Sequence, residues 1–165
     1  VMENEGKSTV AANLALGLAQ EGNRVMLIDC DFRKPAQYKI FDMEGKNGDD
    51  LGKVLTGKAG TENLIRNWND TNLCMILNRT STNSIETMLK STTLRQIVGF
   101  CRQNMDYVII DTSPLALVSA VTPCLSTEPT AMTSSKAAGY WTPLLPVFPA
   151  AATIRIPARS AAFTA

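Results

Sequence analysis

Near the start of the chain stands the sequence Glu3-Asn4-Glu5-Gly6-Lys7-Ser8-Thr9. It matches the second half of a phosphate-binding loop that runs directly into a helix. The glycine lets backbone N–H groups approach a phosphate, the lysine supplies a positive charge, and the serine hydroxyl can bind Mg²⁺. The complete pattern G-x-x-x-x-G-K-[ST] would place its first glycine at Val1. That glycine and the strand that usually delivers the loop are expected to be missing, and an ordinary surface loop is the alternative interpretation.

The segment 9–20 has apolar residues at helical spacing, which predicts a helix that packs on a sheet. The residues expected on its apolar face are Val10, Ala11, Leu14, Ala15, Leu18 and Ala19. Gly22 follows and is expected to end the helix. The positive N-terminal end of this helix would face the same anion as the loop.

Two continuous apolar runs end in aspartate. Residues 24–29 predict a buried strand that ends at Asp29, with Asp31 two positions later. Residues 107–111 predict a second strand that ends at Asp111, in the form of a Walker B strand. The carboxyl ends of strands are where open α/β sheets bind ligands, so these three aspartates are candidate site residues.

The remaining segments complete an alternation of helices and strands. Short helices are predicted at 51–55 and 61–66, a strand at 73–77, and helices at 83–90 and 91–103. Ser91 is the expected N-cap of the last helix, whose buried stripe would be Leu94, Ile97, Val98 and Cys101. Such alternation predicts an α/β fold, with a mainly parallel sheet covered on both faces.

Composition excludes several classes of function. The chain has 165 residues, enough for one domain, and its formal net charge of +1 argues against a nucleic-acid partner. It contains no histidine, which excludes Ser-His and Cys-His nucleophilic triads. The four cysteines have no metal-binding spacing, so a reducing cytosol is expected. Without a signal peptide or an apolar run of about 20 residues, membrane association would require a partner.

The composition changes at about residue 119. Six of the eight prolines follow that point, and alanine, serine and threonine dominate without any lasting period. We therefore predict a partial phosphate-loop domain at 1–118 and an atypical segment at 119–165. That segment is expected to be either a disordered linker or the product of out-of-frame translation.

Three segments together resemble the bacterial tyrosine kinases, the cytosolic autokinases of capsular and exopolysaccharide synthesis. They are residues 5–15 (EGKSTVAANLA), 27–35 (LIDCDFRKP) and 107–114 (YVIIDTSP). The resemblance covers roughly residues 3–118. The run Arg33-Lys34-Pro35 is its most discriminating part, because it separates this family from the related plasmid-partition and septum-site ATPases.

The resemblance implies a P-loop NTPase three-layer fold, here with the first strand missing and the C-terminal part atypical. It implies a kinase that uses ATP and Mg²⁺ to phosphorylate tyrosines on the tail of a neighbouring subunit, within a homo-oligomeric ring. The expected activator is a membrane-embedded polysaccharide chain-length regulator, which would hold the kinase at the inner face of the plasma membrane.

The resemblance also implies residue roles. Nucleotide binding falls to Asn4, Glu5, Gly6, Lys7, Ser8 and Thr9, with Lys7 at the β- and γ-phosphates and Thr9 at the α-phosphate. The metal and its waters fall to Ser8, Asp29 and Asp111. Asp31 would orient or deprotonate the attacking tyrosine, completing a catalytic set of Lys7, Asp29, Asp31 and Asp111. Arg33 and Lys34 would serve phosphate charge or a subunit contact.

The chain departs from that family in its tyrosines. Tyr140 is the one tyrosine beyond Tyr107, so the expected tyrosine cluster is absent from the tail. Two alternatives therefore stay open. One is a partition-type ATPase switch that hydrolyses ATP without phosphorylating protein, and the other is a nucleotide-binding regulatory module without kinase activity.

Overall fold

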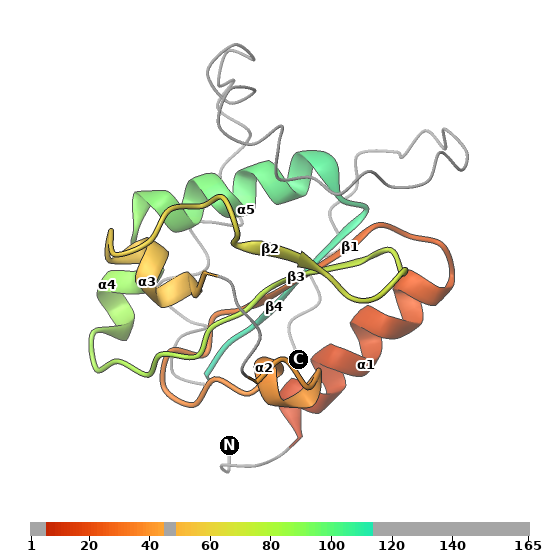
Figure 1. Ribbon diagram of the computed structural model, residues 1–165, viewed down its shortest axis with the longest axis horizontal. Helices are drawn as coiled ribbons and strands as arrows, with labels where there is room; N and C mark the ends of the chain where they lie inside the picture. The colour runs from red at the N-terminus through yellow and green to blue at the C-terminus, as the bar shows by residue number, and fades with distance from the viewer. Residues whose placement is uncertain (1–5, 45–48, 114–165) are drawn as a thin grey trace.

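In the computed structural model of this protein, residues 6–44 and 49–113 are described, and they build one open four-stranded sheet with helices on both faces (Figure 1). The strands are β1 (Val25–Asp29), β2 (Ile65–Asn67), β3 (Leu73–Ile76) and β4 (Tyr107–Asp111). Their spatial order is β2-β3-β1-β4. The central strand β1 runs parallel to both of its neighbours, whereas β2 pairs antiparallel with β3. The expected α/β fold with a mainly parallel sheet is confirmed.

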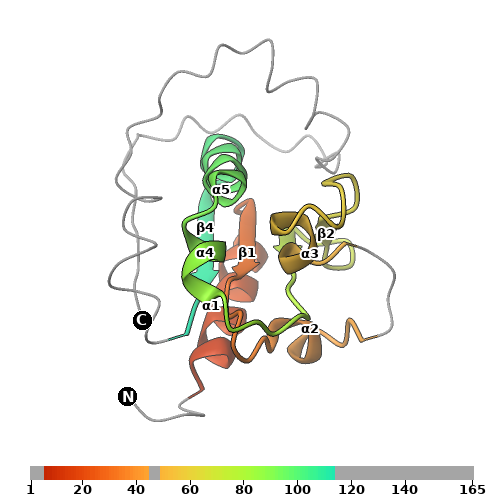
Figure 2. The same cartoon turned by 90° about the vertical axis from the view of Figure 1, so that its left-hand side faces the viewer.

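The helices are α1 (Lys7–Gln20), α2 (Gln37–Ile40), α3 (Leu51–Leu55), α4 (Ile85–Leu89) and α5 (Thr92–Asn104). Figure 1 shows α5 on one side of the strands and α1 on the other. Figure 2, turned by 90°, shows β4 and β2 on opposite sides of β1. The domain therefore has three layers.

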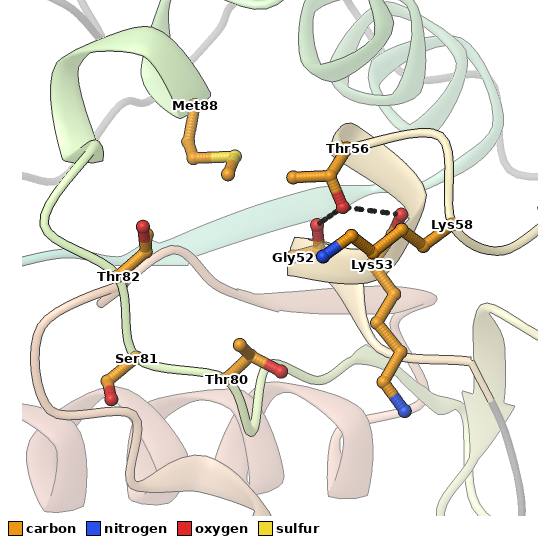
Figure 3. Close-up of a pocket in the computed structure, with 8 residues that line it drawn as sticks. All are labelled: Gly52, Lys53, Thr56, Lys58, Thr80, Ser81, Thr82 and Met88. Atoms are coloured by element: carbon orange, nitrogen blue, oxygen red, sulfur yellow. Dashed lines mark hydrogen bonds between the residues drawn. The ribbon is translucent and has the colours of Figure 1, made fainter.

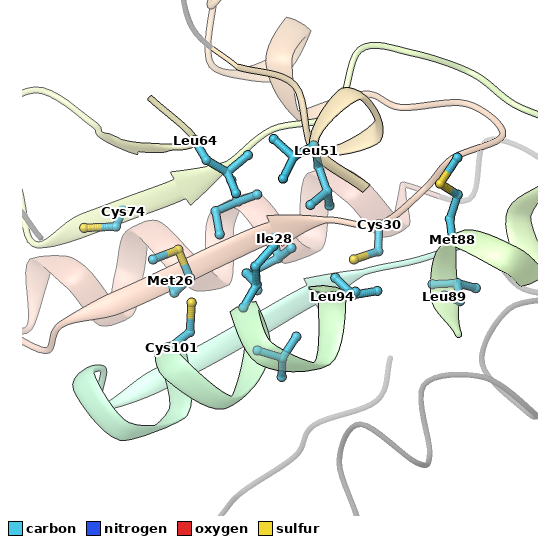
Figure 4. Close-up of a cluster of buried hydrophobic side chains, with 14 of the residues drawn as sticks. Met26, Ile28, Cys30, Leu51, Leu64, Cys74, Met88, Leu89, Leu94 and Cys101 are labelled. Atoms are coloured by element: carbon cyan, nitrogen blue, oxygen red, sulfur yellow. The ribbon is translucent and has the colours of Figure 1, made fainter. Parts of the chain in front are cut away.

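Alternate residues of β1 feed two separate cores. Met26 and Ile28 pack with α3, α4 and α5 on one face, as Figure 4 shows. Val25 and Leu27 pack with α1 and with Phe41 on the other face. Every residue of β1 is buried, which explains why its sequence is continuously apolar rather than alternating.

The expected buried stripe of α5 is confirmed: Leu94, Ile97, Val98 and Cys101 are its buried residues. Ser91 is the N-cap residue as predicted, although its side chain makes no capping hydrogen bond. The predicted helix 83–90 is shorter than expected, since it begins at Ile85.

Two of the predictions are wrong. The segment 61–66 is not a helix: only a turn forms at Thr61–Leu64, and Ile65 begins strand β2. The tight turn after β2, closed by the Trp68 N–H donating to Leu73 O (2.9 Å), folds this segment back onto β3. Backbone pairing with an existing strand outweighs the helical tendency of so short a segment.

The apolar face of α1 also differs from the prediction. Ala12, Ala15 and Ala19 are buried, whereas Val10 and Leu14 are 54% and 43% exposed. The helix thus turns its smallest side chains toward the sheet, because only these allow the helix backbone to lie close to the strands.

Candidate functional site

The site begins at the N-terminus of α1, where Gly6 is the N-cap residue with φ +77° and ψ 12°. A residue with a side chain is strained at such a positive φ, so this turn favours glycine. Lys7, Ser8 and Thr9 form the first turn of the helix, and the backbone N–H groups at the N-terminus of a helix can bind an anion. Asn4 and Glu5 lie outside the described residues.

Asp29 and Asp111 stand side by side at the carboxyl ends of two neighbouring parallel strands. They are direct partners in the register of β1 and β4, and they are 0% and 5% exposed. Asp29 Oδ2 accepts hydrogen bonds from the backbone N–H groups of Gln37 (3.1 Å) and Ala36 (3.3 Å). Asp29 Oδ1 accepts one from the Asp31 N–H (3.1 Å). These three hydrogen bonds fix the orientation of the Asp29 carboxylate beside Asp111.

Burial raises the pKa of Asp29 well above its ordinary value, and the neighbouring carboxylate of Asp111 raises it further. A divalent cation beside the two carboxylates would offset both effects. The described residues contain no group of three or more histidine, cysteine or acidic side chains that could hold a metal alone. This donor set fits Mg²⁺, which commonly uses one or two carboxylates and completes its shell with waters and substrate phosphates.

Gln37 connects the start of α1 to the two aspartates, although the sequence did not indicate it as a site residue. Its Nε2 donates to Asp111 Oδ2 (2.8 Å) and to the backbone oxygen of Ser8 (2.9 Å), and its backbone N–H donates to Asp29. The side chain is 0% exposed, and its Oε1 has no hydrogen-bond partner. No sequence pattern could have found it, since one glutamine eight residues after the end of a strand carries no spacing signal.

Asp31 organises the loop that follows β1. Its Oδ1 accepts hydrogen bonds from the backbone N–H groups of Arg33 (3.0 Å) and Lys34 (2.9 Å), both of which have exposed side chains. The Thr82 N–H donates to Phe32 O (2.8 Å), which fixes this loop against the segment between β3 and α4. The loop therefore has a defined shape, with Asp31 at the edge of the buried carboxylate pair.

A polar hollow of about 310 Å³ lies beside this loop. Its lining is Arg33, Ser81, Thr82, Asn83 and Ile85. It provides one guanidinium and several hydrogen-bonding groups but no carboxylate, so it is suited to an anionic or polar segment.

Figure 3 shows a second hollow, of about 340 Å³, between α3 and residues 80–82. Lys53 and Lys58 line it, together with hydroxyl groups and Met88. None of the motif residues contributes to it. The candidate site is therefore the region around Ser8, Asp29, Asp111 and Gln37, not the larger hollow.

Comparison with known proteins identifies relatives of this chain. A family model described as an AAA domain matches residues 4–130. The tyrosine-protein kinase YwqD of Bacillus subtilis (strain 168) is 35% identical over 115 residues, which cover 70% of this chain and 48% of YwqD. The tyrosine-protein kinase CpsD of Streptococcus agalactiae is 32% identical over 118 residues, covering 72% of this chain and 51% of CpsD. The chain thus spans about half the length of these curated relatives.

Solved structures agree with the sequence relatives. The BceF tyrosine kinase domain superposes with a TM-score of 0.62 at 29% identity, covering 73% of this chain and 47% of that domain. The septum site-determining protein MinD of Pyrococcus horikoshii OT3, solved with Mg-ADP, superposes with a TM-score of 0.56 at 22% identity, covering 67% of this chain and 44% of MinD. The likeness to MinD shows a shared fold.

Proposed function

This chain belongs to the AAA domain family and resembles bacterial tyrosine-protein kinases along part of their length, and on that premise we propose that it is the nucleotide-binding part of an ATP-dependent tyrosine autokinase. The observation that carries the proposal is the buried pair Asp29–Asp111 beside the helix that begins at Lys7. Arg33-Lys34-Pro35 favours the kinase over a partition-type ATPase.

In the proposed site, one set of residues binds the phosphates and a second set binds the metal. The loop Asn4–Gly6 and the first turn of α1 hold the phosphates, with Lys7 at the β- and γ-phosphates and Thr9 at the α-phosphate. Ser8, Asp29 and Asp111 hold Mg²⁺ and its waters. When bound, Mg²⁺ neutralises phosphate charge and orients the γ-phosphoryl group. Most of the acceleration would come from this positioning and charge neutralisation.

Asp31 is proposed to orient the attacking tyrosine and to take its proton. A bond forms between the phenolic oxygen and the γ-phosphorus, the bond to the β–γ bridging oxygen breaks, and ADP leaves. The backbone N–H groups of Arg33 and Lys34 donate to Asp31 Oδ1, and these hydrogen bonds hold its carboxylate in a fixed orientation. Arg33 and Lys34 would neutralise phosphate charge or contact a neighbouring subunit.

The resemblance also supports proposals about the whole protein. A membrane-embedded polysaccharide chain-length regulator would activate it, on the cytoplasmic side of the plasma membrane, and the parent protein would form a homo-oligomer that controls capsular or extracellular polysaccharide synthesis. None of the helices in 6–44 and 49–113 is long and apolar enough to cross a membrane. Co-purification of the full-length kinase with such a regulator tests this part.

Calorimetric titration of the chain with ATP in the presence of Mg²⁺ tests the nucleotide site. The Lys7→Ala variant should bind ATP at least about tenfold more weakly, since a contact between a charged group and a phosphate contributes roughly 1.5–3 kcal/mol. Lys58→Ala, which removes an exposed lysine of the Figure 3 hollow, is the matched control and should bind like the unaltered chain.

A phosphotyrosine assay then separates the activities. Phosphate transfer to tyrosine supports the autokinase, and phosphate release without phosphotyrosine would indicate the partition-type ATPase. Nucleotide binding without either would indicate a regulatory module. Equal ATP affinity of the unaltered chain and Lys7→Ala would refute the proposed phosphate site.

A further inference from the structure

We infer that Gln37 is a positioning residue that locks the phosphate-loop helix to both buried aspartates, and that its Oε1 accepts a hydrogen bond from a water of the hydrated Mg²⁺. The first half of this inference stands on contacts within the chain. The second half rests on the proposed function, because it requires a metal beside Asp29 and Asp111.

The contacts of Gln37 join three elements that are far apart in the sequence. Through Nε2 it contacts Ser8 O at 2.9 Å and Asp111 Oδ2 at 2.8 Å, and through its backbone N–H it contacts Asp29 Oδ2 at 3.1 Å. One residue therefore ties the start of α1 to the ends of β1 and β4. A displacement of Ser8, Asp29 or Asp111 relative to the other two would therefore strain a hydrogen bond to Gln37.

These contacts also fix which way the amide points. Ser8 O and the Asp111 carboxylate are both hydrogen-bond acceptors, so the atom that faces them must be the NH₂ group, whose two hydrogens are thereby used. The carbonyl oxygen Oε1 must face away from both. Turning the amide over would place an oxygen against two acceptors.

Oε1 is left buried without a partner among the described residues. A buried unsatisfied acceptor is costly, and native proteins seldom keep one unless a ligand, an ion or a water completes it. Waters bound to a divalent cation are strong donors, and the carboxylates that would attract the cation are the groups that Gln37 already contacts. A metal-bound water is thus the donor that the local chemistry favours.

The test uses the full chain, with ADP as the probe, titrated by calorimetry with and without Mg²⁺. Gln37→Met keeps the length of the side chain but removes its donors and its acceptor. Mg²⁺ should strengthen ADP binding by the unaltered chain, and in Gln37→Met this enhancement should fall about tenfold or more, as for other residues that orient metal ligands. Without Mg²⁺ the affinity for ADP should fall less than it does with Mg²⁺, because only the looser first turn of α1 then weakens binding.

Gln96→Met is the matched control, because Gln96 is exposed on α5 and should leave both affinities unchanged. Full Mg²⁺ enhancement in Gln37→Met would overturn the water-acceptor part. If neither the unaltered chain nor Gln96→Met binds ADP, the proposed function fails, and the acceptor part fails with it.

Hydrogen exchange without any ligand decides the positioning part separately. Losing the bond to Ser8 O should loosen the first turn of α1, so its amides should exchange faster in Gln37→Met than in Gln96→Met. Equal exchange in the two variants would overturn the positioning role, whatever the calorimetry shows.

Gln37→Glu covers the case in which Gln37→Met does not fold. It places a third carboxylate beside Asp29 and Asp111, so Mg²⁺ alone should raise its melting temperature more than that of the unaltered chain. The same Mg²⁺ effect in both proteins would overturn the inference that Gln37 faces the metal.

Discussion

Arg24 and Asp106 form an ion pair at the amino ends of β1 and β4. The Arg24 side chain donates to Asp106 Oδ1 through Nη2 at 2.8 Å, and to Oδ2 through Nε at 3.3 Å. The backbone N–H of Arg24 also donates to Oδ2 at 2.8 Å. These contacts join the starts of two strands whose other ends carry Asp29 and Asp111. The pair therefore supports the register on which the site depends.

We predict that Asp106→Asn lowers the free energy of unfolding by about 1 kcal/mol near neutral pH, because it loses charge-assisted hydrogen bonds. Hydrogen bonding to Arg24 lowers the pKa of Asp106 in the folded chain. The ionised Asp106 therefore contributes fully to the free energy of unfolding above the unfolded pKa of about 3.9. This contribution is lost as the pH falls through the lower pKa of the folded chain.

Urea denaturation of both proteins at several pH values measures this difference. It should be largest near neutral pH and should shrink toward zero in acid. Glu86→Gln, which removes the exposed pair with Lys90 on α4, is the control and should change stability little. A difference for Asp106→Asn that does not depend on pH would contradict the prediction.

The sequence predicts some individual site residues better than others. Asp29 and Asp111 can be found because a buried strand that ends in aspartate is a recognisable pattern, and parallel strands bring their carboxyl ends to the same edge. Gln37 cannot be found in this way. Its position depends on how the loop after Asp31 turns back, and on side-chain contacts with two distant elements.

Helix α1 lies close to the sheet because its buried residues are alanines. Ala12, Ala15 and Ala19 are at most 5% exposed, and they pack in the core that contains Val25 and Leu27. This spacing sets the height of the first turn above the ends of the strands. The packing of the helix thus determines where Lys7 and Ser8 stand relative to the aspartates.

We predict that Ala15→Leu lowers the free energy of unfolding by about 1–3 kcal/mol, because the larger side chain has no space between helix and sheet. Asn13→Leu, at an exposed position of the same helix, is the control and should have little effect. Chemical denaturation gives both values. If Ala15→Leu is as stable as the control, the close packing inferred for α1 is wrong.

The element predictions succeed where a segment is long and periodic. The stripe of α5 and the run of β1 have many apolar residues at one spacing, and both elements form as predicted. The segment 61–66 is too short to show a period, and its conformation is decided by pairing with β3, which lies later in the chain. Such a tertiary contact is not visible in local sequence.

The core on the side of α3, α4 and α5 contains three of the four cysteines. Cys30, Cys74 and Cys101 are buried and form no disulfide among the described residues, and Cys124 lies outside those residues. Burial raises the pKa of the Cys74 and Cys101 thiols to about 12. In the folded protein they are therefore protonated and shielded from reagents.

We predict that iodoacetamide near pH 8 does not modify Cys74 or Cys101 in the native protein, because the thiolate is the reactive form. Both should become reactive across the same range of urea concentration in which the far-UV circular dichroism is lost. Peptide mass spectrometry identifies the modified positions. Rapid modification without denaturant would show that the core around Met26 opens readily.

The architecture of the whole molecule is predictable because alternating helices and buried strands permit few arrangements. The mainly parallel sheet, its cover on both faces and the likeness to tyrosine-protein kinases all agree with the expectation. The antiparallel β2 is the exception, since its strand was not predicted. The predicted boundary at residues 118–119 lies outside the described residues.

The strand order has a consequence for how the chain is made. Among the described strands, the central strand β1 is synthesised first, and its partners β3 and β4 follow only after long intervening segments. During translation, one edge of β1 stays unpaired until β3 has emerged from the ribosome, and the other edge stays unpaired until β4 has emerged. Non-local pairing of this kind slows folding and leaves the nascent chain open to aggregation. Among the described strands, the pairing that brings Asp29 and Asp111 together is therefore completed last, and chaperones that hold newly made chains should bind this protein before it is finished.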